Sequence, residues 1–111
     1  MDITVVKELV AALEDKFAQE VQVLEITEIS SLGDYFVLAT GKNESQIDAM
    51  AGAASECLHK NRLKLKNTEG RGSTGWVLLD FGAIIVHIFD EEARGFYKLD
   101  SLWADAKHIE I

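Results

Sequence analysis

Residues 76–103 read WVLLDFGAIIVHIFDEEARGFYKLDSLW, and their first half carries the strongest β-structure signal in the chain. Trp76–Phe81 and Ile84–Phe89 are rich in β-branched and aromatic residues, and only Gly82 and Ala83 separate them. Two such runs joined by two residues, one of them glycine, are typical of a β-hairpin with a tight turn. We therefore predict two antiparallel strands here.

The register of this hairpin divides its side chains between two faces. Pairing Phe81 with Ile84 makes one face entirely apolar, and we expect that face to enter the core. The apolar face comprises Val77, Leu79, Phe81, Ile84, Val86 and Ile88. The other face comprises Trp76, Leu78, Asp80, Ile85, His87 and Phe89. Its mixture of aromatics, an acid and an imidazole suits either a layer covered by a helix or a surface that binds a partner.

The residues before the hairpin predict a helix, two strands and a second helix. Apolar side chains at three- and four-residue steps predict an amphipathic N-terminal helix. Its buried stripe comprises Ile3, Val6, Val10, Leu13 and Phe17. Val21–Ile26 is short and β-branched, which predicts a strand. Tyr35–Thr40 is almost continuously apolar and predicts an interior strand covered on both faces.

The second helix begins after Asn43, because Asn43 followed by Gln46 resembles a capping box, and Asn61 ends it. Its buried stripe comprises Ile47, Met50, Ala54 and Leu58. Leu63 and Leu65 suggest a short strand, and the glycine-rich Asn67–Gly75 predicts an exposed, mobile loop. Short helical turns are expected after Asp90.

This order of elements places the chain in the α/β class. We predict one domain, residues 1–111, built as a two-layer sandwich with helices on a mixed sheet of about five strands.

Composition and charge limit where such a protein works and what it binds. Eleven Lys and Arg against 19 Asp and Glu give a net charge of −8, which disfavours direct binding of nucleic acid. An acidic chain can still reach a ribonucleoprotein by docking on a basic protein there. The single cysteine, Cys57, fits a reducing cytoplasm. The N-terminus lacks the basic region of a targeting peptide, and no apolar run approaches the roughly 20 residues that span a bilayer.

No catalytic, metal or cofactor site emerges from the residues. Asp80-Phe81-Gly82 matches a kinase motif by letters only, because the rest of the kinase signature is missing. The glycines of Glu69–Gly75 are followed by Trp76 rather than by the Lys and helix of a phosphate-binding loop. The three histidines lack the spacing of zinc ligands, and Cys57 falls on the apolar side of its helix, as a structural thiol would.

The aromatic residues are the best candidates for function. Trp76, Tyr97 and Trp103 lie beside loops, acids and Arg94, and Trp, Tyr and Arg are frequent among binding hot spots. His87 is either a partly buried histidine hydrogen-bonded to a neighbour or a direct partner contact.

Four segments together resemble the Iojap/RsfS family of ribosomal silencing factors. They are DYFVLATG (34–41), EG (69–70), WVLLDFGAIIVHIF (76–89) and RGFYKLDSLW (94–103). The resemblance runs from the first helix to Trp103. Three positions depart from the family pattern: Glu91 stands near a common proline, Gly75 replaces a frequent acid, and Ala83 replaces a common turn aspartate.

The resemblance implies a fold and a function. The fold is related to nucleotidyltransferases but lacks their catalytic carboxylates, so we expect no enzyme activity. The function is docking on the large ribosomal subunit through ribosomal protein L-fourteen, which blocks subunit association and represses translation when nutrients are scarce. Carried onto this sequence, the partner-binding residues are Trp76, Leu78, Asp80, Arg94, Tyr97, Leu99 and Trp103. The hairpin face adds His87 to the predicted partner-binding residues.

Other functions remain open at this point. A nucleotide-handling enzyme would need paired carboxylates to hold Mg²⁺, and Asp80 has no acid two positions away. A homodimer of the free protein would use the mixed hairpin face as its seam, and a role in assembly of the large subunit is a further alternative.

Overall fold

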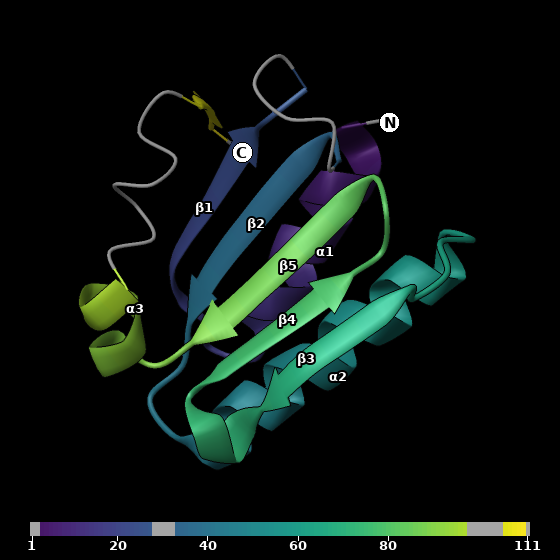
Figure 1. Cartoon of the computed structure of the whole chain (residues 1–111). Helices are drawn as coiled ribbons and strands as arrows, with labels where there is room; N and C mark the ends of the chain where they lie inside the picture. Colours follow the sequence, from purple (N-terminus) through teal and green to yellow (C-terminus); the bar gives the residue numbers. More distant parts are fainter. Residues whose placement is uncertain (1–2, 28–32, 98–105, 111) are drawn as a thin grey trace.

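The computed structural model describes residues 3–27, 33–97 and 106–110, without the side chains of residues 96 and 97. Its elements follow one another as a helix, two strands, a helix, three strands, a short helix and a last strand (Figure 1). In chain order they are α1 (Ile3–Asp15), β1 (Gln19–Glu25), β2 (Tyr35–Thr40), α2 (Glu44–Lys60), β3 (Asn67–Arg71), a 3₁₀ turn (Gly72–Thr74), β4 (Trp76–Asp80), β5 (Ile84–Phe89), α3 (Glu91–Tyr97) and β6 (Lys107–Ile109).

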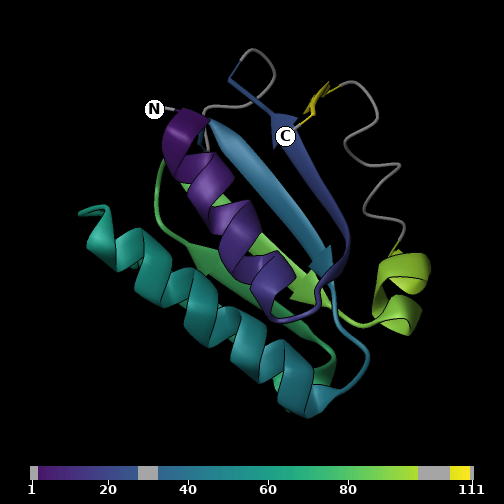
Figure 2. The same cartoon turned by 180° about the vertical axis from the view of Figure 1, so that it is seen from behind.

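The strands of the described residues form one mixed sheet in the order β3-β4-β5-β2-β1-β6. β2 and β5 pair in parallel, and the other neighbours pair antiparallel. α1 and α2 contact one another and cover one face of the sheet (Figure 2). The predicted α/β class with a mixed sheet is confirmed, although the described sheet has six strands rather than about five.

β2 lies between β5 and β1 and has the bounds predicted from its apolar run, Tyr35–Thr40. All of its residues after Tyr35 are buried. A strand with sheet neighbours on both edges and side chains packed on both faces meets little water, which is why its sequence is apolar without alternation.

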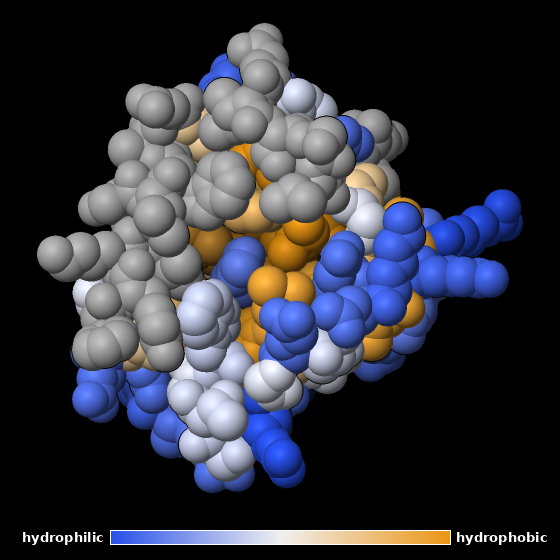
Figure 3. All heavy atoms as spheres, in the orientation of Figure 1, coloured by the Kyte–Doolittle hydropathy of each residue, from blue (hydrophilic) through white to orange (hydrophobic). Residues whose placement is uncertain are grey.

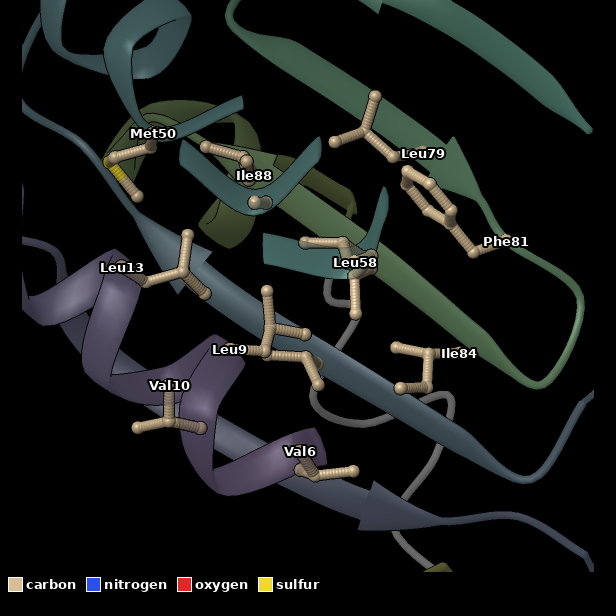
Figure 4. Close-up of a cluster of buried hydrophobic side chains, with 14 of the residues drawn as sticks. Val6, Leu9, Val10, Leu13, Met50, Leu58, Leu79, Phe81, Ile84 and Ile88 are labelled. Atoms are coloured by element: carbon tan, nitrogen blue, oxygen red, sulfur yellow. The ribbon is translucent and has the colours of Figure 1, made fainter. Parts of the chain in front are cut away.

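The hairpin of β4 and β5 has the predicted register, with Leu79 opposite Val86 and Val77 opposite Ile88. Its apolar face belongs to the main core cluster, which also takes Val6, Leu9, Val10 and Leu13 from α1 and the predicted stripe of α2. Figure 4 shows these side chains converging between the helices and the sheet. The main core cluster therefore lies between the helix layer and the sheet, and a second buried cluster that includes Phe36, Leu38 and Phe89 lies on the opposite face of the sheet.

Gln46 joins the two helices in a way the capping box does not predict. The side-chain oxygen of Asn43 accepts from the Gln46 N–H at 2.9 Å, as expected. Gln46 Oε1, however, accepts from the Lys42 N–H at 2.6 Å, and its Nε2 donates to the carbonyls of Lys16 and Phe17 at 3.0 Å each. The start of α2 is thereby tied to the end of α1.

The prediction that Phe17 belongs to the buried stripe of α1 is wrong. α1 ends at Asp15, and 82% of Phe17 is exposed. The N–H groups of Phe17 and Ala18 donate to the carbonyls of Glu14 and Leu13 at 2.9 and 3.2 Å, and Phe17 has a φ of 63°. This is a Schellman termination, which turns the chain away from the helix and the side chain away from the core.

Two predictions around β3 are also wrong. Leu63 and Leu65 form no strand, and Asn67–Arg71, predicted as loop, pairs with β4 along its whole length. β3 is an edge strand whose side chains are all exposed, so backbone hydrogen bonds hold it in place and its sequence needs no apolar pattern. The prediction of an exposed segment was right.

Candidate partner-binding surface

The face of the sheet opposite α1 and α2 carries the candidate surface, here called the outer face. Directly opposed residues of antiparallel strands point to the same side of a sheet. In β3 and β4 the pairs on this side are Asn67 with Asp80, Glu69 with Leu78 and Arg71 with Trp76. Figure 3 looks onto the outer face and shows hydrophobic residues in its middle, with hydrophilic side chains below and to the right.

A pocket of about 330 Å³ opens on this face between β3 and β4. Its described lining comprises Glu69, Gly70, Thr74, Trp76 and Leu78. Gly70 makes the close approach of the two strands possible, because it has a φ of 74° and a Cβ there would run into the carbonyl oxygen of Trp76. Thr74 closes the end of the pocket, with Oγ1 2.7 Å from the Arg71 carbonyl oxygen and 3.0 Å from that of Trp76.

Trp76 is held in place by β5. Its indole Nε1 donates to His87 Nδ1 at 3.3 Å, and its ring stacks on Phe89 with centroids 6.4 Å apart. These contacts with the neighbouring strand fix the orientation of the ring that forms the pocket wall. Trp76 as a whole is only partly buried.

His87 supports this arrangement from inside the protein. Only 7% of the residue is exposed, and its ring meets Phe36 edge to face at 5.0 Å. Burial lowers the pKa of His87 from 6.5 to about 4, so at neutral pH the ring is uncharged. Since Nδ1 accepts from Trp76, the proton lies on Nε2, which has no hydrogen-bond partner among the described residues.

Asp80 closes the hairpin turn. Its carboxylate accepts from the Gly82 N–H at 2.8 Å, and Gly82 has a φ of 83°. Asp80 as a whole is partly buried.

Arg94 lies inside the fold rather than on the surface. It is 6% exposed, and its guanidinium donates to the Glu20 carbonyl and to Thr40 Oγ1, both at 2.8 Å. The guanidinium also sits 5.3 Å from the centre of the Phe89 ring. Arg94 therefore anchors α3 to β1, β2 and β5.

The structure brings together Trp76, Leu78, Asp80 and His87 on one face of the hairpin, as predicted. The side chain of Tyr97, and Leu99 and Trp103 altogether, lie outside the described residues. Sequence reasoning missed Glu69, Gly70 and Thr74 as pocket residues, because β3 was predicted as a loop. The EG dipeptide (69–70) was nevertheless a signal, since it belongs to the segments that resemble the family.

Other reactive groups lie apart from this surface. Burial raises the pKa of the Cys57 thiol, with a smaller contribution from Glu8. Within the described part of the chain, no three His, Cys, Asp or Glu residues come close enough to hold a metal ion. Among the same residues, no helix is both long and apolar enough to cross a lipid bilayer.

Fold and surface together define a small mixed α/β protein whose outer face carries an apolar pocket edged by a carboxylate. Residues 2–111 match the family described as "Ribosomal silencing factor during starvation". The chain belongs to this family, the RsfS ribosomal silencing factors.

Relatives support the assignment over most of the chain. The chain is 34% identical to the ribosomal silencing factor RsfS of Bacillus subtilis, over 93% of this chain and 87% of that protein. It is 30% identical to the chloroplastic protein Iojap of Arabidopsis thaliana, over 94% of this chain and 43% of that protein. A crystal structure from Bacillus halodurans superposes with a TM-score of 0.85 at 30% identity, covering 99% of this chain and all of that one. A structure from Chromobacterium violaceum gives 0.87 at 30% identity, over 94% and 88% of the two chains.

Proposed function

We propose that this protein silences ribosomes by docking its outer face on ribosomal protein L-fourteen of the large subunit, in the cytoplasm. Occupying that site would block association with the small subunit and lower translation when nutrients are scarce. The family supports a ribosomal partner. The observation that carries the proposal is the pocket wall formed by Trp76, a large aromatic side chain that is fixed by His87 and still partly exposed.

The residues of the surface have different parts in this proposal. Trp76, Leu78 and Asp80 contact the partner directly. His87 and Arg94 are buried, so they act by holding Trp76 and α3 in position. Tyr97, Leu99 and Trp103 remain predicted contacts.

Co-sedimentation with purified large subunits tests the docking surface. We expect Trp76→Ala to weaken binding about 30-fold, the typical effect of truncating a hot-spot aromatic. Phe17→Ala is the matched control, because it removes an exposed aromatic side chain outside the outer face. Normal binding by a folded Trp76→Ala variant would show that the surface is misplaced.

Order of addition tests the steric mechanism. The protein, added to large subunits before small subunits, should reduce the yield of joined ribosomes, and cross-linking should recover L-fourteen. Subunit joining at the normal rate on saturated large subunits would refute the block and favour a role in subunit assembly.

An enzyme related to nucleotidyltransferases is the alternative from another class. It would bind a nucleoside triphosphate with Mg²⁺ through paired carboxylates. Asp80 instead uses its carboxylate to close the hairpin turn. Calorimetry with nucleoside triphosphates and Mg²⁺ should therefore give no heat of binding, and tight binding would revive the alternative.

A further inference from the structure

We propose that the outer-face pocket receives one arginine side chain of the protein partner. The aliphatic part of that side chain would lie against Trp76 and Leu78, and its guanidinium would meet the Glu69 carboxylate. This inference rests on the proposed docking of the outer face, and it names the chemistry of the group that is recognised there.

The shape of the pocket selects a single long side chain. Two of its walls, Trp76 and Leu78, are apolar, and Glu69 stands opposite Leu78 in the strand register. A volume of about 330 Å³ is at the small end of ligand sites, which suits one side chain better than a cofactor. An occupant must therefore be apolar along its length and polar at its end.

The charge of the pocket selects a cation. Glu69 is the one charged residue among the described residues that line it. Its carboxylate forms no hydrogen bond or ion pair within the described part of the chain. An exposed carboxylate beside an apolar wall attracts a cationic group whose stem can cover that wall.

The charges around the pocket also favour a cationic occupant. Asp80 and Asp90 lie at the two ends of β4, Asp80 as its last residue and Asp90 beside Gly75, which precedes Trp76. The cations of the adjoining segments are Arg71, opposite Trp76 in the register, and Lys66, whose ammonium lies beside Gly82 at the hairpin turn. Neither cation lines the described pocket.

Arginine fits these groups better than lysine does. Its planar guanidinium stacks on an indole and can donate two parallel hydrogen bonds to one carboxylate, whereas an ammonium is a compact, strongly hydrated charge. The pocket is formed before the partner arrives, because His87 fixes the indole of Trp76 and Gly70 allows β3 to lie close against β4.

Binding of purified large subunits at one ionic strength tests the sign of the occupant's charge. Glu69→Gln should weaken binding about tenfold, because it removes a charge-assisted contact. Arg71→Gln should strengthen binding about twofold, because it removes a nearby like charge. Glu56→Gln is the control: it neutralises an exposed acid on α2, in a pair with Lys60, and should bind like the wild type. All three positions are exposed, so the fold should survive each change.

The results separate the two proposals. Wild-type binding together with an unchanged Glu69→Gln affinity overturns the arginine pocket alone. Stronger binding of Glu69→Gln together with weaker binding of Arg71→Gln also overturns it, because that result would indicate an acidic occupant. Failure of the wild type to bind large subunits overturns the proposed function.

If the wild type does not bind large subunits, a small-molecule probe without ribosomes still tests the arginine pocket. Nα-acetyl-arginine amide should shift the NMR signals of the Trp76 indole and the Gly70 amide, and the neutral citrulline analogue should not. Equal shifts with both compounds, or none with either, overturn it.

Discussion

Phe17 occupies a backbone position that helix ends usually give to glycine. Its φ of 63° places a bulky residue in the left-handed region, and its side chain is 82% exposed. Phe17→Gly should therefore raise the free energy of unfolding by about 1 kcal/mol, since it relieves backbone strain without opening the core. Urea denaturation measures the change. Lys16→Gly, one position earlier and without a positive φ, should be destabilising, and a loss of stability in Phe17→Gly would show that the side chain has a structural contact.

His87 makes stability depend on pH in one direction. Its pKa is about 4 in the folded protein and 6.5 ordinarily, so between these values the unfolded chain binds more protons. The free energy of unfolding should fall as pH drops from about 6.5 to about 4, by roughly 3 kcal/mol from this residue alone. Denaturation across this pH range in the wild type and in His87→Phe isolates the contribution.

The test compares the pH dependence of the free energy of unfolding in the wild type and in His87→Phe. The comparison is needed because carboxylates titrate in the same pH range and contribute to both profiles. His108→Gln is the control for removal of an imidazole, since His108 is exposed in β6. Parallel profiles for the wild type and His87→Phe would mean that folding does not lower the pKa of His87.

At the scale of elements, replacement of two glycines by alanine should change the stability of the protein in opposite directions. In β3, Gly70 has a positive φ and no space for a Cβ, so Gly70→Ala should cost about 2 kcal/mol and speed hydrogen exchange in β3. In α2, Gly52 faces open space, so Gly52→Ala should stabilise the protein by about 0.5–1 kcal/mol. Thermal denaturation and amide exchange distinguish them. Equal effects would mean that the β3–β4 approach is looser than described.

The elements also show what a sequence can predict. The β4–β5 register, β2 and the stripe of α2 were predictable because burial imposes a period on their side chains. β3 was not, because an edge strand with exposed side chains is held by its backbone. Because β3 was predicted as a loop, its residues Glu69 and Gly70 were not predicted to line the pocket.

The buried position of Arg94 was unpredictable for another reason. Its acceptors belong to Glu20 and Thr40, which lie far away in sequence and are brought close only by the sheet order. The pairing of Trp76 with His87 lay within reach, since the hairpin register puts both on one face.

At the scale of the whole molecule, the net charge of −8 should make docking sensitive to salt. An acidic protein approaching a basic one gains long-range attraction that screening removes. We expect the dissociation constant for large subunits to rise about tenfold between about 0.05 and 0.3 M salt. Binding measured at several salt concentrations checks this, with sodium chloride and potassium glutamate compared as a control for anion effects. A salt-independent affinity would assign the binding energy to the apolar pocket alone.

The parallel contact between β2 and β5 has a consequence for how the protein is made. β2 lies in the centre of the sheet, yet its partner follows only after α2, β3 and β4 have been synthesised. A nascent chain thus carries an apolar strand with one unsatisfied edge until β5 follows, and pairings between distant segments form slowly. The sheet centre can form only after residue 89 has left the ribosome, so the growing chain depends on protection from aggregation until then.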